Sequence, residues 1–134
     1  MNYEIEKLEV HGDGRGWLVE ALKQDQIPDG QSIRQIYVAS IKPGCVRGNH
    51  YHKKRMEWFF LIGADAEIHL EDMETKEKKV IFFSSEAMQR VAVYPNVAHA
   101  VANKGSETVY LVSAQNDIFD PNDKDSFEHK IVHS

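Results

Sequence analysis

Short apolar stretches separated by turn residues make up most of the chain. They span residues 33–41, 57–62, 66–70, 80–83, 91–94 and 108–113. The stretch 57–62 is almost continuously apolar, whereas 66–70 alternates between apolar and polar side chains. Glycine, proline and asparagine lie between these stretches, where turns are expected. Many short strands at regular spacing are typical of a sandwich or a small barrel, so the pattern predicts an all-β fold.

The chain holds no linker, internal repeat or low-complexity tract, and we therefore predict a single domain over residues 1–134. The charged stretch 71–79 is expected to be a hairpin loop. A helical turn is expected at 21–26 and another at 86–89. The polar tail 116–134 is expected to pack across the barrel or across a partner subunit.

Composition narrows the possible partners. The 134 residues include 16 basic and 21 acidic side chains, a net charge of −5, with no basic stripe that would suit nucleic acid. The first residues do not resemble a signal peptide, and no apolar run reaches membrane-spanning length, so no membrane partner is expected. Cys45 is the only cysteine, which excludes an internal disulfide and fits a cytoplasmic protein.

Histidines at a spacing of two suggest a metal site. Side chains two apart on a strand face the same way, roughly 6–7 Å apart, so His50 and His52 can reach one ion while Tyr51 faces away. A short turn can bring in Glu57, and His99 is placed to complete the set. Three imidazoles and one carboxylate suit zinc, iron, manganese or nickel, with open positions for water or substrate.

The frame around these residues resembles the two sequence motifs of the cupin superfamily. The first runs through Gly44, His50, His52, Glu57 and Gly63, and the second through Pro95, His99 and Asn103. The resemblance implies a double-stranded β-helix, the cupin jelly-roll barrel. The intervals Glu57–Gly63 and Pro95–His99 are each one residue shorter than usual. Asn96 stands in the turn where a glycine is usual, and asparagine tolerates the left-handed conformation such a turn needs.

Neighbouring segments resemble particular sugar-nucleotide cupins. Residues 13–20 are similar to the opening strand of dTDP-4-dehydrorhamnose 3,5-epimerases, and Arg47 to His52 is similar to a segment of the same enzymes. With Tyr37 upstream, that segment also resembles the dTDP-sugar 3,4-ketoisomerases. Together with Glu57 and residues 116–121 it looks closest to the zinc-binding C-terminal cupin of bifunctional capsular-polysaccharide reductases.

This resemblance implies an epimerase or ketoisomerase in cell-surface polysaccharide biosynthesis. The substrate would be a dTDP- or UDP-linked 4-keto-6-deoxy sugar, and the protein would be a homodimer. A base would remove a proton beside the C4 carbonyl, which requires a stabiliser for the enolate oxygen. Histidine suits the base and tyrosine the acid.

Two candidate roles of His50, catalytic base and metal ligand, exclude each other. In the epimerases and ketoisomerases the matching histidine is the base, but a metal-bound nitrogen has no free lone pair. Either the site is metal-free and His50 is the base, or it binds metal and Tyr37 or Tyr110 serves as acid and base. The sequence is compatible with both possibilities.

Substrate contacts are expected from Arg47, Arg15 and Asn49. Either arginine can clamp a diphosphate, although a surface ion pair or a turn contact with Asp13 would also explain them. Two further functions remain as alternatives: a metal-dependent dioxygenase or hydrolase, and a non-catalytic, metal-stabilised sugar-binding cupin.

Overall fold

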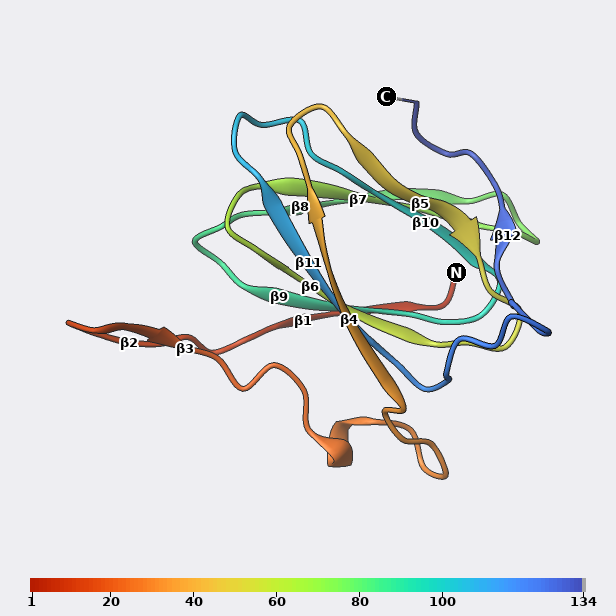
Figure 1. Ribbon diagram of the computed structural model, residues 1–134, viewed down its shortest axis with the longest axis horizontal. Helices are drawn as coiled ribbons and strands as arrows, with labels where there is room; N and C mark the ends of the chain where they lie inside the picture. The colour runs from red at the N-terminus through yellow and green to blue at the C-terminus, as the bar shows by residue number, and fades with distance from the viewer. Residues whose placement is uncertain (134) are drawn as a thin grey trace.

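Two five-stranded antiparallel sheets face each other in the computed structural model, which describes residues 1–133 (Figure 1). One sheet has the order β1-β9-β6-β11-β4 and the other β12-β5-β10-β7-β8, with β2 and β3 forming a separate hairpin. The strands are β1 Tyr3–Lys7, β2 His11–Asp13, β3 Gly16–Leu18, β4 Gln35–Ile41, β5 Val46–Tyr51, β6 Glu57–Ile62, β7 Ala66–Asp72, β8 Lys78–Phe83, β9 Gln89–Val93, β10 Val97–Ala102, β11 Val109–Gln115 and β12 Phe127–Glu128.

These strands confirm the predicted all-β fold and the cupin arrangement. A 3-10 turn, η1 (Gln24–Gln26), lies in the segment predicted to turn. The helical turn predicted at 86–89 is wrong, because Gln89 already begins β9 and pairs with β1. The predicted loop 71–79 is shorter than expected. The Asp72 carboxylate accepts the backbone N–H groups of Glu74 and Thr75, which folds the turn tightly between β7 and β8.

Strand β6 is apolar on both faces because both are covered. Phe59 and Leu61 point into the main core between the two sheets. Trp58 and Phe60 point outward into a second apolar cluster, where residues of the segment 8–33 cover them. Glu57 begins the strand on the inner face, so this carboxylate enters the barrel beside the core.

A bulge in β5 sets which side chains enter the barrel. His99 of β10 pairs with His50, but Ala100 pairs with Gly48, so Asn49 is the extra residue, at φ 58°. Regular alternation would point Arg47 and His50 to opposite faces because they are three residues apart. The bulge shifts the alternation by one, and both side chains line the same cavity.

The tail predicted to pack across the barrel lies along β5, and we call residues 116–133 the C-terminal strap. Its strand β12 pairs with β5, placing Phe127 opposite Tyr51, with ring centroids 5.3 Å apart. The backbone N–H of His129 donates to the carbonyl of Asn49. The β2–β3 hairpin, by contrast, projects away from the barrel (Figure 1). None of the helices in the described part of the chain is long and apolar enough to cross a membrane.

Candidate metal centre and active site

Four side chains predicted as ligands meet at the inner surface of the barrel. His50 comes from β5, His52 follows that strand directly, Glu57 begins β6 and His99 comes from β10. One ligand atom from each lies within 4.8 Å of the others. Asn96 takes the left-handed conformation, φ 66°, that the sequence requires of the shortened turn before His99. The turn therefore accommodates the missing residue, and His99 reaches the cluster.

The Glu57 carboxylate is buried and oriented. Its Oε2 accepts a hydrogen bond of 2.9 Å from the Ser113 hydroxyl. Its Oε1 contacts Nε2 of His52 and lies 3.9 Å from Nε2 of His99. Burial alone would raise the pKa of Glu57, but the two imidazoles and the hydroxyl outweigh it and lower the pKa to about 2. The cluster therefore contains a carboxylate ion at neutral pH.

The imidazoles of His50 and His99 are held in the neutral form that binds metal. Burial, together with the nearby imidazoles of His99 and His52, lowers the pKa of His50 to about 4. Burial also lowers the pKa of His99. Neutral imidazoles beside an ionised carboxylate are the protonation states a metal ion requires.

The residues fit a divalent ion. Nε2 of His52 and Nε2 of His99 are buried without a hydrogen-bond partner, although buried polar nitrogens are seldom left unpaired. Both nitrogens face the Glu57 carboxylate. A cation between these atoms would satisfy them together, and three nitrogens with one oxygen form a donor set that zinc accepts.

A cavity of about 310 Å³ opens beside the cluster. Tyr37 and Arg47 line it together with His50 and His99, so the structure brings four predicted site residues to one space. Burial, followed by the charge of Glu57, raises the pKa of Tyr37 to about 12. The phenol is therefore protonated and can donate.

Of the predicted substrate-binding residues, Arg47 lies at the cavity and Asn49 binds the C-terminal strap. Arg47 donates through Nε to the carbonyl of Ser40, which fixes the guanidinium at the cavity wall and leaves its other N–H groups available. The amide of Asn49 is bound to the strap instead. Its Oδ1 accepts the N–H groups of Ile131 and Val132.

Two other predicted site residues lie away from the cavity of their own chain. Arg15 is in the projecting hairpin, where it pairs with Asp13 at 2.6 Å. Tyr110 is on the outer face of β11, because Leu111 and Ser113 occupy the inner positions of that strand. Alternation along β11 would have assigned Tyr110 to the outside once the direction of Ser113 was known.

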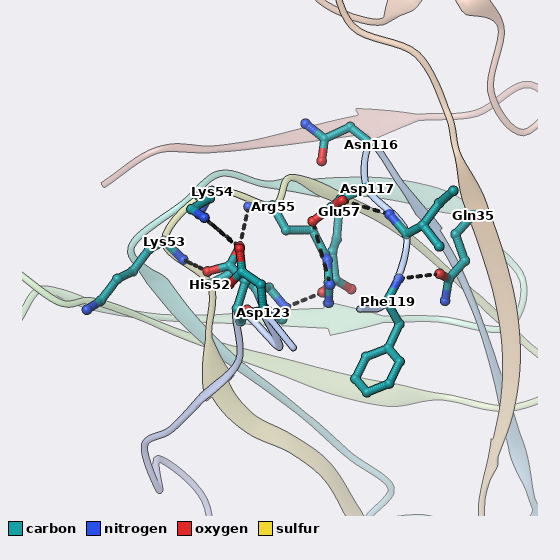
Figure 2. Close-up of polar contacts among 12 residues, drawn as sticks. Gln35, His52, Lys53, Lys54, Arg55, Glu57, Asn116, Asp117, Phe119 and Asp123 are labelled. Atoms are coloured by element: carbon teal, nitrogen blue, oxygen red, sulfur yellow. Dashed lines mark hydrogen bonds and ion pairs between the residues drawn. The ribbon is translucent and has the colours of Figure 1, made fainter. Parts of the chain in front are cut away.

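Sequence reasoning missed three polar residues around the cluster. Ser113 orients Glu57, and Asp125 of the strap contacts the turn that carries the ligands. Arg55 lies buried in that turn, with its guanidinium 3.8 Å from Asp117 (Figure 2). Ser113 has a sequence signal, since it is a hydroxyl in an apolar strand, whereas Asp125 is one of several acids in a polar tail.

One family covers most of the chain. Residues 11–127 match the family described as Polysaccharide biosynthesis C-terminal domain. A curated relative is the UDP-2-acetamido-2,6-beta-L-arabino-hexul-4-ose reductase of Pseudomonas aeruginosa, 27% identical over 118 residues. The match spans 88% of this chain but only 30% of the reductase.

Solved structures share the fold. The capsular polysaccharide assembling protein CapF from Staphylococcus aureus is 26% identical, with a TM-score of 0.70 over 92% of this chain and 33% of that protein. A sugar 3,4-ketoisomerase from Thermoanaerobacterium thermosaccharolyticum, in complex with TDP, is 21% identical with a TM-score of 0.76, over 96% of this chain and 88% of that one. These matches confirm the predicted resemblance to capsular reductases and ketoisomerases.

Proposed function

The chain belongs to the Polysaccharide biosynthesis C-terminal domain family, and from that membership we propose that it is an isomerase of the epimerase or 3,4-ketoisomerase type. The proposed substrate is a 4-keto-6-deoxy sugar linked to dTDP or UDP and used for cell-surface polysaccharide. The main support is the cavity, where a guanidinium, a protonated phenol and a neutral imidazole line one space. These belong to Arg47, Tyr37 and His50.

The proposed reaction is a proton transfer beside a carbonyl. A ketone at C4 acidifies the hydrogens on C3 and C5, and removal of one leaves an enolate whose charge lies on O4. Return of a proton to the opposite face of the same carbon inverts it. Where the proton was lost from C3, its return to C4 together with transfer of the C3 hydroxyl proton to O4 moves the carbonyl from C4 to C3 instead. Both outcomes need a proton donor and a base held close to the sugar ring.

Tyr37 and Arg47 suit the donor and the binding group. The raised pKa keeps the Tyr37 phenol protonated, so it can hydrogen-bond the enolate oxygen or supply a proton. The free N–H groups of Arg47 can grip a diphosphate in the two-pronged manner typical of guanidinium.

We propose the ligand role for His50, because its low pKa keeps the ring neutral and the other three ligand atoms lie beside it. A zinc ion held by His50, His52, Glu57 and His99 would supply Lewis-acid stabilisation of the enolate oxygen. Tyr37 would then both take the proton from carbon and return one, since a nearby cation favours the ionised form of its phenol. Without metal, the same His50 ring would be free to accept the substrate proton. Metal content therefore separates the two versions of the proposal.

Deuterium exchange tests the function directly. In D₂O, the protein should place deuterium at C3 or C5 of TDP-4-keto-6-deoxyglucose or its UDP counterpart, or at C4 of the 3-keto product. Tyr37→Phe should slow exchange by about 100-fold or more, the usual contribution of a general acid. Tyr110→Phe, on the outer face, is the matched control and should leave the rate unchanged. Absence of exchange with both nucleotides would refute the proposal.

Removal of metal decides the role of His50. If exchange stops when a chelator removes the ion and returns when zinc is added, His50 is a ligand. If exchange continues in protein shown to be metal-free, His50 is the base and the metal version is wrong.

We also propose that residues 1–134 act as one domain, in the cytoplasm, as a homodimer. The dimer is supported by an apolar surface on the outer face of β4 and β11, where Ile36 and Val38 are 63% and 68% exposed beside Tyr110. The strand β4 is also a free sheet edge. A second copy of the same chain would cover this edge and the apolar side chains together.

A further inference from the structure

One residue of the C-terminal strap, Asp125, contacts the turn between two ligand-bearing strands. Its carboxylate accepts three backbone N–H groups of that turn at 2.8, 3.0 and 3.0 Å. The donors are Lys53, Lys54 and Arg55. The turn joins His52 to Glu57, as Figure 2 shows. Asp125 therefore fixes the chain segment that connects these two ligands, although it lies about seventy residues further along the chain.

The same residue also contacts a ligand side chain. The backbone carbonyl of Asp125 lies 2.6 Å from Nδ1 of His52. A carbonyl can only accept a hydrogen bond, so Nδ1 must carry the proton. With Nδ1 committed to this hydrogen bond, Nε2 of His52, which faces the Glu57 carboxylate, is the ring nitrogen that can hold a cation. That tautomer is the one a cation at the cluster requires.

We propose that Asp125 is a positioning residue of the metal centre. Its carboxylate fixes the turn 53–55, and its carbonyl selects the His52 tautomer whose Nε2 faces the cluster. This inference rests on the proposed metal-binding function of the four ligands. It adds that the strap, which carries none of those ligands, is part of the centre.

Independent contacts hold the strap against the ligand strand. The side-chain amide of Asn49 donates to the carbonyl of Val132 and accepts two strap N–H groups. The Phe127 ring stacks on Tyr51, and Nζ of Lys53 lies 4.4 Å from the centroid of the Phe127 ring. Asp125 therefore approaches the turn from a segment that is itself fixed along β5.

The backbone of Asp125 is in a conformation that needs such support. Its φ is 39°, in the left-handed region that costs a non-glycine residue free energy, and the residue is only 6% exposed. Burial would raise the pKa of Asp125, but the backbone N–H groups of the turn outweigh it and lower the pKa. An ionised, buried carboxylate with three donors supplies the restraint that this conformation requires.

The ring of His52 gives a test in zinc-loaded protein. In ¹⁵N NMR of the histidine rings, the native zinc-loaded protein should show a protonated Nδ1 and a zinc-bound Nε2 for His52. Asp125→Asn should populate the other tautomer, because the amide offers one acceptor oxygen to three donors and the turn is released. An unchanged His52 ring pattern in a folded Asp125→Asn protein would overturn the proposal.

Metal affinity gives the second readout. Zinc titration against a competing chelator should show affinity reduced about tenfold or more in Asp125→Asn, in the range found when groups supporting metal ligands are removed. Asp125→Glu keeps the charge and should recover part of the loss; it also serves if the Asn variant does not fold. Asp123→Asn is the matched control, because the Asp123 carboxylate pairs with the exposed Nζ of Lys54 and not with the backbone of the turn.

The outcomes separate this inference from the proposed function. If the native protein binds no zinc, the metal centre and the role of Asp125 in it both fail. If the native protein binds zinc and Asp125→Asn matches it in affinity and His52 tautomer, only the inference fails. A loss of affinity equal in Asp123→Asn and Asp125→Asn would also contradict it, because a general charge effect would then explain both.

Discussion

Ser113 and Glu57 meet across the β6–β11 pair, where the Ser113 hydroxyl donates to Oε2 of Glu57 at 2.9 Å. The bond occupies one carboxylate oxygen and directs the other toward His52 and His99. A single hydroxyl on the opposite strand thus decides which oxygen is available to an ion.

Ser113→Ala should therefore weaken metal binding without altering the ligands. We expect zinc affinity to fall about tenfold, because the carboxylate loses the bond that orients it. Competition titration with a chelator measures the change. Ser40→Ala removes a hydroxyl from an exposed position on β4 and should have no effect. Equal affinities in the native protein and Ser113→Ala would show that the bond does not orient Glu57.

Gly48→Ala should destabilise the barrel at the ligand strand. A Cβ on Gly48 would lie 2.7 Å from the carbonyl oxygen of His99, and φ is 100°, which disfavours any side chain. We expect a loss of about 2 kcal/mol or more in the free energy of unfolding, measured in urea. Gly14→Ala meets nothing within 4 Å and is the control. A loss no larger than that of the control would argue against close strand contact here.

Acid should destabilise the metal-free protein. The pKa of His50 is about 4 in the folded state, against an ordinary value of 6.5. Between these two pH values the His50 ring is therefore protonated in the unfolded chain and neutral in the folded protein. Stability is therefore fully present above pH 6.5 and falls as the pH drops toward 4, by about 2 kcal/mol between pH 7 and pH 5 for this histidine. Urea unfolding of chelated protein at pH 7 and pH 5 measures it. His50→Asn should flatten the dependence; an equally steep curve would assign it to other groups.

Val38→Asp should convert the proposed dimer into monomers. A carboxylate in the apolar surface of β4 would have to be buried without a partner when a second copy covers it. Analytical ultracentrifugation gives the mass of each form. Val80→Asp places the same change on β8 of the other sheet and should leave the dimer intact. A native protein that sediments as a monomer would contradict the dimer.

Much of the fold follows from the local pattern. The apolar stretches became β4, β6, β7, β8, β9 and β11, with ends shifted by a few residues. The ligand pair His50 and His52 follows from strand alternation, and Asn96 takes the left-handed turn expected of it. These features depend on neighbours in sequence, which periodicity and turn chemistry describe well.

The remainder of the site depends on contacts between distant segments. Asn49 was expected near the substrate, but its amide binds Ile131 and Val132, more than eighty residues away. The contact of Asp125 with His52 spans a similar distance. Tyr110 sits on the outer face because pairing with β4 and β6 sets the direction of the whole strand. Nothing in the local sequence records such pairings.

The extra residue in β5 has a consequence for protein engineering. The guanidinium of Arg47 and the ring of His50 line the same cavity because the alternation of side chains changes at Asn49. This arrangement requires two residues between them, one of which is bulged. On a regular strand of another barrel, the same spacing would turn one of these two side chains outward. To reproduce this arrangement in another barrel, residues 47–50 would have to be transferred together, along with a neighbouring strand that accommodates the irregular register.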